Sequence, residues 1–413
     1  MLEVLKKADR TTYLLIVACG ISAALLAAML LHMVGEEAGS NSYALMAEGF
    51  LHGRLDVDRC FDSDCVTFDG KSYVVFPPVP AVVAMPFVAI FGPDFAGFSA
   101  IGFSFFLASL FLWNRIFMDM GVGRQSAIWL LLALAFASPL FYVSIRADRV
   151  WFFAQCINFF LLSLALHEVM RGGRLVVAGI CLGLAFLCRQ MTILLVPFYF
   201  VLALKAEEKL ISFGWPHISR ALKIGLPVAV AVGIYMAYNY ARFAAPMETG
   251  YAYIAKPHLE QWSLINNRLL DHGLFSSAYF LFNAFHLFVQ GFHVEWGGPN
   301  LLTPTKLDPM GTSLLAASPF VLLLYFVPIR RPVVIGGLCA LLILGITLFY
   351  HGNGFSQYNT QRFVLDWAPV LFYALAATMA AQKALRPALG ILVFYGVGLN
   401  LVMLGLLAVL HQS

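Results

Sequence analysis

The stretch YALMAEGFLHGRLDVDRCFDSDCVTFDGKSYVVFPPVPAVVAMPFVAIFG, residues 43–92, places a charged insert with two cysteines after an apolar segment long enough to cross a bilayer. The insert leads into an apolar run, residues 78–92, that several prolines interrupt. Tyr43, Met46, Ala47, Phe50 and Leu51 recur at helical spacing, which predicts a short amphipathic helix in the membrane interface. Whether the run 78–92 crosses the membrane decides the orientation of every later loop.

The composition of the chain identifies a membrane protein. Of its 413 residues, 61% are hydrophobic and only 12% are charged, whereas a soluble domain is nearer half apolar and a quarter charged. One water-soluble core cannot hide so much apolar surface, so we expect an all-α polytopic fold. The net charge of +4 is small and gives no indication of a nucleic-acid partner.

Lysine and arginine residues set the expected orientation, because they are enriched in cytoplasmic loops. Lys6, Lys7 and Arg10 precede the first apolar segment, so we expect a cytoplasmic N-terminus and a retained first span. Basic residues then fall at every inner turn of about eleven transmembrane helices, with the C-terminus outside. The expected spans are 12–34, 98–118, 127–143, 150–169, 175–189, 190–204, 225–240, 312–327, 333–350, 368–382 and 389–410.

Two apolar runs, 78–92 and 278–292, are left out of that count. The first is about 15 residues long, short of the ~20 that a spanning helix needs, and counting it would move the later arginine turns to the outside. We therefore expect both runs to be re-entrant or interfacial pieces of the outer face. The expected organisation is one membrane domain, 1–413, with large outer segments at 35–97 and 241–311. Residues 205–223 are expected at the inner surface, so most of the extramembrane chain lies on one side, as in an enzyme that works there.

The seven cysteines divide into two groups. Five lie in apolar segments, where a buried thiol is the ordinary expectation. Cys60 and Cys65 instead flank a polar stretch of the insert, and we expect them to pair if that insert faces an oxidising compartment. No further cysteine or histidine lies nearby at the spacing of a metal site.

The order of motifs resembles that of the GT-C glycosyltransferases, which use polyprenyl-phosphate sugars and include protein O-mannosyltransferases, aminoarabinose transferases and uncharacterised bacterial relatives. The tyrosine-centred helix, HGRL, GKSYVVFPP and PFVAIFG of the insert correspond to their first outer loop. LGLAFLCRQMTILLVP (182–197), NYARFAAPMETGY (239–251) and YHGNGFSQYNTQRFVLDWAP (350–369) resemble later motifs. The acidic pair that the family carries before the tyrosine is replaced here by Gly39 and Ser40, with Glu36 and Glu37 nearby.

Inverting sugar transfer needs a carboxylate that accepts the proton of an acceptor hydroxyl, and cations that hold the phosphate leaving group. The candidate bases are Glu37, which is nearest to the family's acidic position, Asp148, which resembles a second acidic position, and Glu48. An ordinary loop carboxylate remains an alternative for Asp148, and a solvated helix face for Glu48.

Arg189 stands out among the candidate cations because it lies between two apolar stretches, and a charge inside the bilayer costs about 2.5–3.5 kcal/mol on insertion scales. It must therefore face a wet cavity or a partner, unless its side chain only extends to the membrane surface. The other expected phosphate ligands are Arg362, His351, Arg146 and Lys71.

The sequence and the resemblance together predict an integral-membrane glycosyltransferase that moves a sugar from a polyprenyl-phosphate donor to an acceptor at the outer face. The acceptor would be a glycolipid, a glycan or a protein, and the expected location is a bacterial inner membrane with a periplasmic site. No cofactor is expected, while a requirement for a divalent metal stays open. The alternative is a non-catalytic lipid or glycolipid carrier, which would show a polar path through the bilayer instead of one outer cavity with an acid and an arginine.

Overall fold

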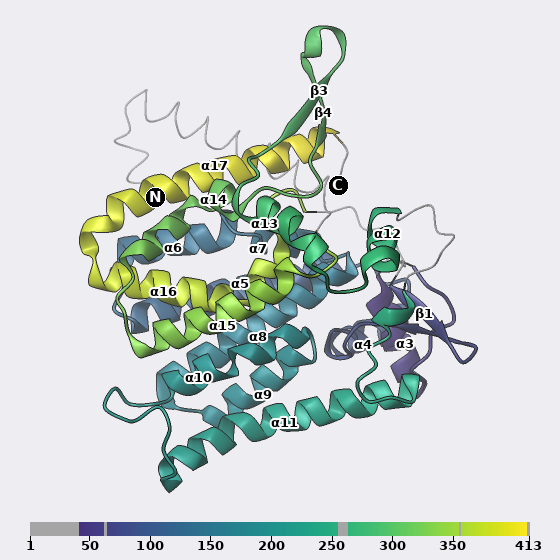
Figure 1. Ribbon diagram of the computed structural model, residues 1–413, viewed down its shortest axis with the longest axis horizontal. Helices are drawn as coiled ribbons and strands as arrows, with labels where there is room; N and C mark the ends of the chain where they lie inside the picture. The colour runs from purple at the N-terminus through teal and green to yellow at the C-terminus, as the bar shows by residue number, and fades with distance from the viewer. Residues whose placement is uncertain (1–40, 62–63, 255–262, 355–356, 411–413) are drawn as a thin grey trace, which may run out of the picture.

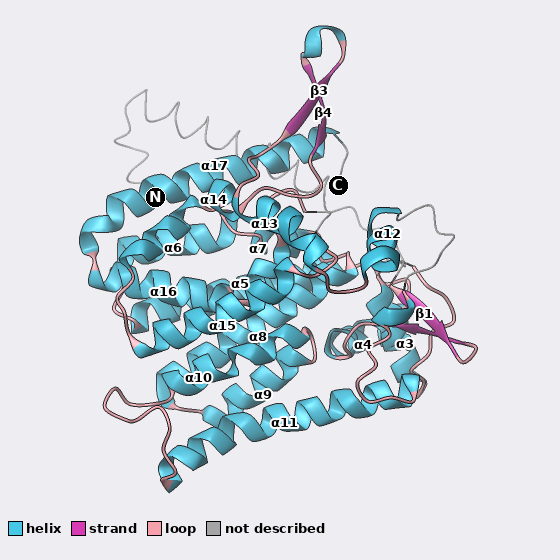
Figure 2. Ribbon diagram, in the orientation of Figure 1, coloured by secondary structure: helices cyan, strands magenta, loops and turns pink. Residues whose placement is uncertain are grey.

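The computed structural model describes residues 41–61, 64–254, 263–354 and 357–410 (Figure 1). The predicted first span and Glu37 lie outside these residues. The described chain is almost entirely helical, and its few strands form two small hairpins (Figure 2). Five helices are long and apolar enough to cross a membrane, and five shorter apolar helices accompany them. The prediction of an all-α polytopic membrane protein is confirmed.

The insert after residue 41 folds into one compact unit. Helix α3 (Ser42–Leu51) begins at Asn41, whose side chain accepts a hydrogen bond from the backbone of Tyr43. The hairpin of β1 (Cys65–Phe68) and β2 (Lys71–Val74) follows, with Cys65 opposite Val74. Most residues of α3 are buried, because the helix packs against α4 (Val79–Phe91), and its placement in the membrane interface stays a prediction.

The proline-interrupted run of the insert forms α4, which has 13 residues and contains Pro86. At 1.5 Å per residue it is about 20 Å long, whereas the hydrocarbon core of a bilayer is about 30 Å thick. Helix α4 ends at Gly92, which has a φ of 79° that a glycine adopts without strain. The helix is therefore too short to cross the membrane by itself, and its re-entrant or interfacial placement stays a prediction.

Helix α8 (Val150–Gly172) is the most buried of the five long apolar helices. It packs between α5 (Phe98–Asp119) and α9 (Leu175–Phe186), and α9 in turn packs along α11 (Trp215–Phe243). Helix α11 begins at Trp215, so residues 215–223, expected at the inner surface, belong to this long helix. The remaining long helices are α15 (Arg331–Leu348) and α17 (Arg386–Leu410).

Several predicted spans are broken in the structure. Residues 127–143 divide into α6 (Arg124–Phe136) and α7 (Leu140–Ile145) at Pro139. Residues 312–327 divide into α14 (Leu314–Ala317) and the 3₁₀ helix η6 (Pro319–Phe326) at Pro319. A proline lacks the backbone donor that a continuous helix needs, and it disfavours helical geometry in the residue before it. The other broken span consists of η1 (Gln190–Leu195) and α10 (Val196–Leu202).

The second outer segment contains α12 (Ser263–His272), α13 (Phe280–Phe288) and a hairpin of β3 (Val294–Gly297) and β4 (Thr303–Leu307). Helix α12 lies beside the insert at one end of the molecule, on the right in Figure 1. The connection from α10 to α11 lies at the opposite end, at the lower left. The remaining elements are α16 (Ala368–Ala381) and the short 3₁₀ turns η2 (Tyr251–Tyr253), η4 (Ser277–Tyr279), η5 (Pro299–Leu301), η7 (Arg362–Asp366) and η8 (Lys383–Leu385).

Candidate functional site

A cavity of about 340 Å³ lies where the insert, α8, the α9–η1 junction and the chain after α15 converge. Among the described residues, the polar lining includes two arginines, one carboxylate, one histidine, three tyrosines, one glutamine and two threonines, and the remaining walls are mainly apolar. The residues that the argument uses are Asp64, Trp151, Arg189, Tyr251, Tyr350, His351 and Arg362. A mainly apolar cavity with a few convergent polar groups is typical of a ligand site.

Arg189 lies at the junction between α9 and η1, as its position between two apolar stretches predicts. Its guanidinium group donates two hydrogen bonds to the Asp366 carboxylate, over 2.6 and 2.8 Å. Asp366 has no exposed surface and also accepts hydrogen bonds from Gln155 and Asn158 of α8. Such a two-point pair fixes the orientation of a guanidinium group, so Arg189 is held in place at the cavity wall.

Arg362 is the second cation of the cavity and begins η7, four residues before Asp366. Its guanidinium carbon lies 5.6 Å from the centre of the Trp151 ring and 5.1 Å from that of Phe363. Burial, followed by repulsion from Arg189, lowers the pKa of Arg362 to about 10. The side chain is therefore still cationic at neutral pH, and an anion in the cavity would relieve the repulsion between the two arginines.

Among the described residues that line the cavity, Asp64 supplies the carboxylate, and the sequence analysis did not single it out. It directly precedes β1, and its backbone carbonyl accepts a hydrogen bond from Val75 that extends the hairpin. Its side chain accepts a hydrogen bond of 2.8 Å from the indole nitrogen of Trp151, the second residue of α8. Burial and Arg189 lower the pKa of Arg362, and the negative charge of Asp64 partly opposes that effect by attraction. The Asp64 carboxylate therefore acts electrostatically on the Arg362 guanidinium group.

His351, Tyr251 and Tyr350 also line the cavity. Burial lowers the pKa of His351 to about 4, so its ring is neutral at pH 7. The Nδ1 atom of this ring is buried and has no hydrogen-bond partner in the part of the chain that the structure describes. Burial also raises the pKa of Tyr251 and Tyr350, which keeps both hydroxyl groups protonated. A buried polar atom without a hydrogen-bond partner raises the free energy of the folded protein. A polar ligand would supply this partner to the Nδ1 atom of His351.

The cavity brings together Arg189, Arg362 and His351 of the predicted site residues. Asp148 and Arg146 do not line it and form a buried pair with each other, with hydrogen bonds of 2.9 and 3.0 Å. Asp148 is thus a structural partner of Arg146 and does not face the cavity. Arg146 is held by Asp148 and is not in position to contact a ligand in this cavity.

Glu48 and Lys71 also lie outside the cavity. Glu48 lines a separate hollow with Arg54, Asp56 and Asp58. Lys71 is exposed, and its nitrogen lies 3.7 Å from Asp56. Both side chains face away from the cavity. Helical spacing and charge do not specify which side of the insert faces the cavity, so they could not place these two residues.

Asp64 and Asp366 are the acidic residues that the sequence analysis missed. Asp64 lies beside Cys65, so the expected disulfide could have marked it as an anchored carboxylate. Asp366 lies four residues after Arg362, and it is the partner that was one of the alternatives for a charged Arg189 in an apolar region. Among the described residues, no group of three histidine, cysteine, aspartate or glutamate side chains could hold a metal ion.

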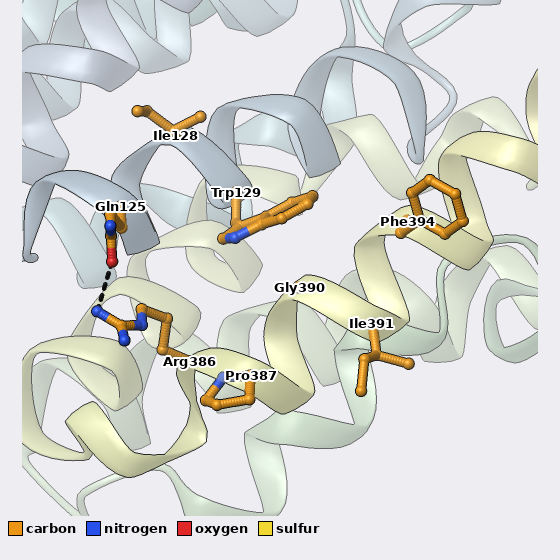
Figure 3. A pocket seen from close by; sticks show the side chains of 8 residues that line it. All are labelled: Gln125, Ile128, Trp129, Arg386, Pro387, Gly390, Ile391 and Phe394. Atoms are coloured by element: carbon orange, nitrogen blue, oxygen red, sulfur yellow. Dashed lines mark hydrogen bonds between the residues drawn. The ribbon is translucent and has the colours of Figure 1, made fainter. Parts of the chain in front are cut away.

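Another hollow, of about 580 Å³, lies between α6 and α17 (Figure 3). Arg386 is the charged residue of its lining, and its guanidinium group donates a hydrogen bond to Gln125 across the hollow. Trp129 lies against Gly390, where an added Cβ atom would come within 3.2 Å of the indole ring. Among the described residues, no carboxylate and no histidine lines this hollow.

No protein-family model and no curated protein matches the chain. A solved structure described as the crystal structure of ArnT from Cupriavidus metallidurans in the apo state is similar to it, with a TM-score of 0.40 and 15% sequence identity. The match covers 91% of this chain and 60% of that one, so this chain spans about three fifths of the length of that structure. By its composition and its apolar helices, the chain itself is a multi-pass, all-α membrane protein.

Proposed function

We propose that the chain is a glycosyltransferase that moves a sugar from a polyprenyl-phosphate donor to an acceptor hydroxyl, with inversion at the sugar carbon. The observation that carries this proposal is the cavity in which two arginines, Arg189 and Arg362, share a wall with the Asp64 carboxylate. This combination matches the two needs of the reaction, cations for the leaving group and a base for the acceptor.

In the proposed reaction, the acceptor oxygen attacks the first carbon of the sugar from the side opposite to the phosphate. The bond between that carbon and the phosphate oxygen breaks, and its electron pair leaves with polyprenyl phosphate. Arg362 and Arg189 stabilise the charge that develops on the leaving oxygen. Asp64 takes the proton of the acceptor hydroxyl and later releases it to water.

The neighbouring residues have supporting roles in this proposal. Asp366 positions Arg189, and the neutral His351 offers its buried Nδ1 atom to a hydroxyl group of the sugar or the acceptor. Glu37 remains a proposed alternative base. The apolar walls suit a lipid-linked donor, and the position of the cavity at the end that carries the insert fits a site on the outer, periplasmic side of a bacterial inner membrane.

The test is transfer of a radiolabelled sugar from a purified polyprenyl-phosphate donor in liposomes that contain the membrane's own glycolipids, glycans or proteins as acceptors. The proposal expects a labelled acceptor and one released polyprenyl phosphate for each sugar transferred. Asp148→Asn, Glu48→Gln and Glu37→Gln are measured beside Asp64→Asn to identify the base. Movement of the labelled donor across the liposome membrane without any transfer would contradict the proposal and support the carrier alternative.

A further inference from the structure

The carboxylate of the cavity lies in a loop that a disulfide closes. The structure joins Cys60 to Cys65, and Asp64 is the residue directly before Cys65. A closed ring of six residues strongly limits the backbone conformations that Asp64 can adopt. The side chain of Asp64 is therefore tied to the conformation of the disulfide loop.

Asp64 is also held from two other directions. Trp151 donates its indole hydrogen bond to the carboxylate from the start of α8, the most buried long helix. Val75 donates a backbone hydrogen bond to the carbonyl group of the same residue. The hairpin thus holds the carbonyl group of Asp64, the disulfide anchors the adjacent Cys65, and Trp151 sets the direction of the carboxylate.

We propose that the Cys60–Cys65 disulfide and Trp151 are positioning residues that hold the Asp64 carboxylate in the cavity, so that sugar transfer requires the closed disulfide. This inference rests on the proposed function. The arginines of the cavity come from other segments, the α9–η1 junction and η7, and neither is part of the disulfide loop. Opening the disulfide should consequently affect the chemical step and leave the binding of the phosphate intact.

The disulfide can be opened selectively. Cys60 is exposed, whereas the free cysteines of the described chain, Cys156, Cys181, Cys188 and Cys339, are buried. Dithiothreitol supplies two electrons and two protons, so that Cys60 and Cys65 become thiols while the two sulfurs of the reagent close into a cyclic disulfide. Removal of the reagent and reoxidation restore the starting protein, which gives a comparison within one preparation.

The experiment measures kcat for transfer and the affinity for polyprenyl phosphate alone, with oxidised, reduced and reoxidised protein in liposomes. We expect reduction to lower kcat by about 10- to 100-fold, the usual effect of misplacing a reacting group, with affinity changed less than about threefold. Reoxidation should restore kcat. Equal turnover of oxidised and reduced protein would overturn the inference and leave the proposed function standing, whereas no transfer by oxidised protein would contradict the proposed function itself.

Substitutions separate positioning from general stability. Trp151→Phe keeps the ring beside Arg362 but removes the hydrogen-bond donor, and Cys60→Ser/Cys65→Ser removes the disulfide without any reagent. Both should lower kcat in the wild-type background and have almost no further effect in the Asp64→Asn background, because they act through one carboxylate. Cys339→Ser in α15 is the matched cysteine control. The inference would be contradicted if these substitutions lowered kcat as much in the Asp64→Asn background as in the wild type. A parallel loss of affinity for polyprenyl phosphate would also contradict it, because both results indicate a general structural role.

Discussion

Arg189 and Asp366 form the ion pair on which the geometry of the cavity depends. Asp366 is fully buried and Arg189 only 19% exposed, so removing one partner leaves a charge without compensation. We predict that Arg189→Gln lowers the free energy of unfolding by about 3–5 kcal/mol, the usual loss for a broken buried pair. The double variant Arg189→Gln/Asp366→Asn should be more stable than Arg189→Gln alone.

The measurement is the unfolding temperature of purified protein in detergent, followed by tryptophan fluorescence. Arg220→Gln is a matched control, because its pair with Glu208 is partly exposed and should contribute far less. A double variant that is less stable than either single variant would show that the pair is not the source of the loss.

At the residue scale, the sequence predicted Arg189, Arg362 and His351 but not the acid that lies with them. A charge in an apolar segment is conspicuous, so Arg189 could be found from its position alone. Asp64 is one of several acidic residues in the insert, and only the course of the hairpin and the hydrogen bond from Trp151 distinguish it. Asp148 and Glu48 had equally suitable charges, but their side chains face other parts of the molecule.

Helices α9 and α11 are in close contact because α9 carries two glycines four residues apart. A Cβ atom at Gly179 would come within 2.6 Å of the carbonyl oxygen of Ile224, and one at Gly183 within 3.0 Å of that of Pro227. Small residues at this spacing let the backbones of membrane helices approach closely. We predict that Gly179→Ala lowers the unfolding temperature and the yield of folded protein.

Gly225 provides the matched control for this prediction, because it lies in α11 and a Cβ atom there meets nothing within 4 Å. Gly225→Ala should leave the unfolding temperature unchanged or raise it slightly, since alanine favours helix. Equal effects of the two substitutions in size-exclusion and thermal-unfolding measurements would rule out close packing as the cause.

At the element scale, long apolar runs were predicted well and broken ones were not. The expected spans 98–118 and 333–350 agree closely with α5 and α15, because each run is mainly apolar and contains no internal proline. The run 312–327 was predicted as one span, but Pro319 divides it into two short helices. Mean hydropathy over the run does not reveal such a break. The proline nevertheless interrupts the backbone hydrogen bonds of the helix.

For the whole molecule, the orientation in the membrane rests on the basic inner turns. We predict that a cysteine at Glu295 in the β3–β4 hairpin reacts with an impermeant maleimide in intact cells, because residues 241–311 are expected outside. A cysteine at Glu207, in the connection from α10 to α11, should react only after the membrane is permeabilised. Both positions are exposed, so a difference in labelling reports the side of the membrane.

The labelling is read against wild-type protein, whose described free cysteines are buried. Labelling of Glu207→Cys in intact cells together with protection of Glu295→Cys would reverse the assigned orientation and with it the outer location of the cavity. Until this labelling is done, the placement of the insert and of residues 241–311 on one outer face stays a prediction. Their convergence on one cavity depends on long-range packing, which periodicity and charge do not specify.

The most direct test of the central claim is the turnover of Asp64→Asn, measured together with its affinity for polyprenyl phosphate. Loss of a general base typically costs about 100-fold or more in rate, so we predict a loss of that size with affinity changed less than about threefold. Glu48→Gln is the matched control, because it removes a carboxylate of the same insert that lies outside the cavity. Full turnover of Asp64→Asn, with the loss appearing in Glu48→Gln instead, would contradict the account.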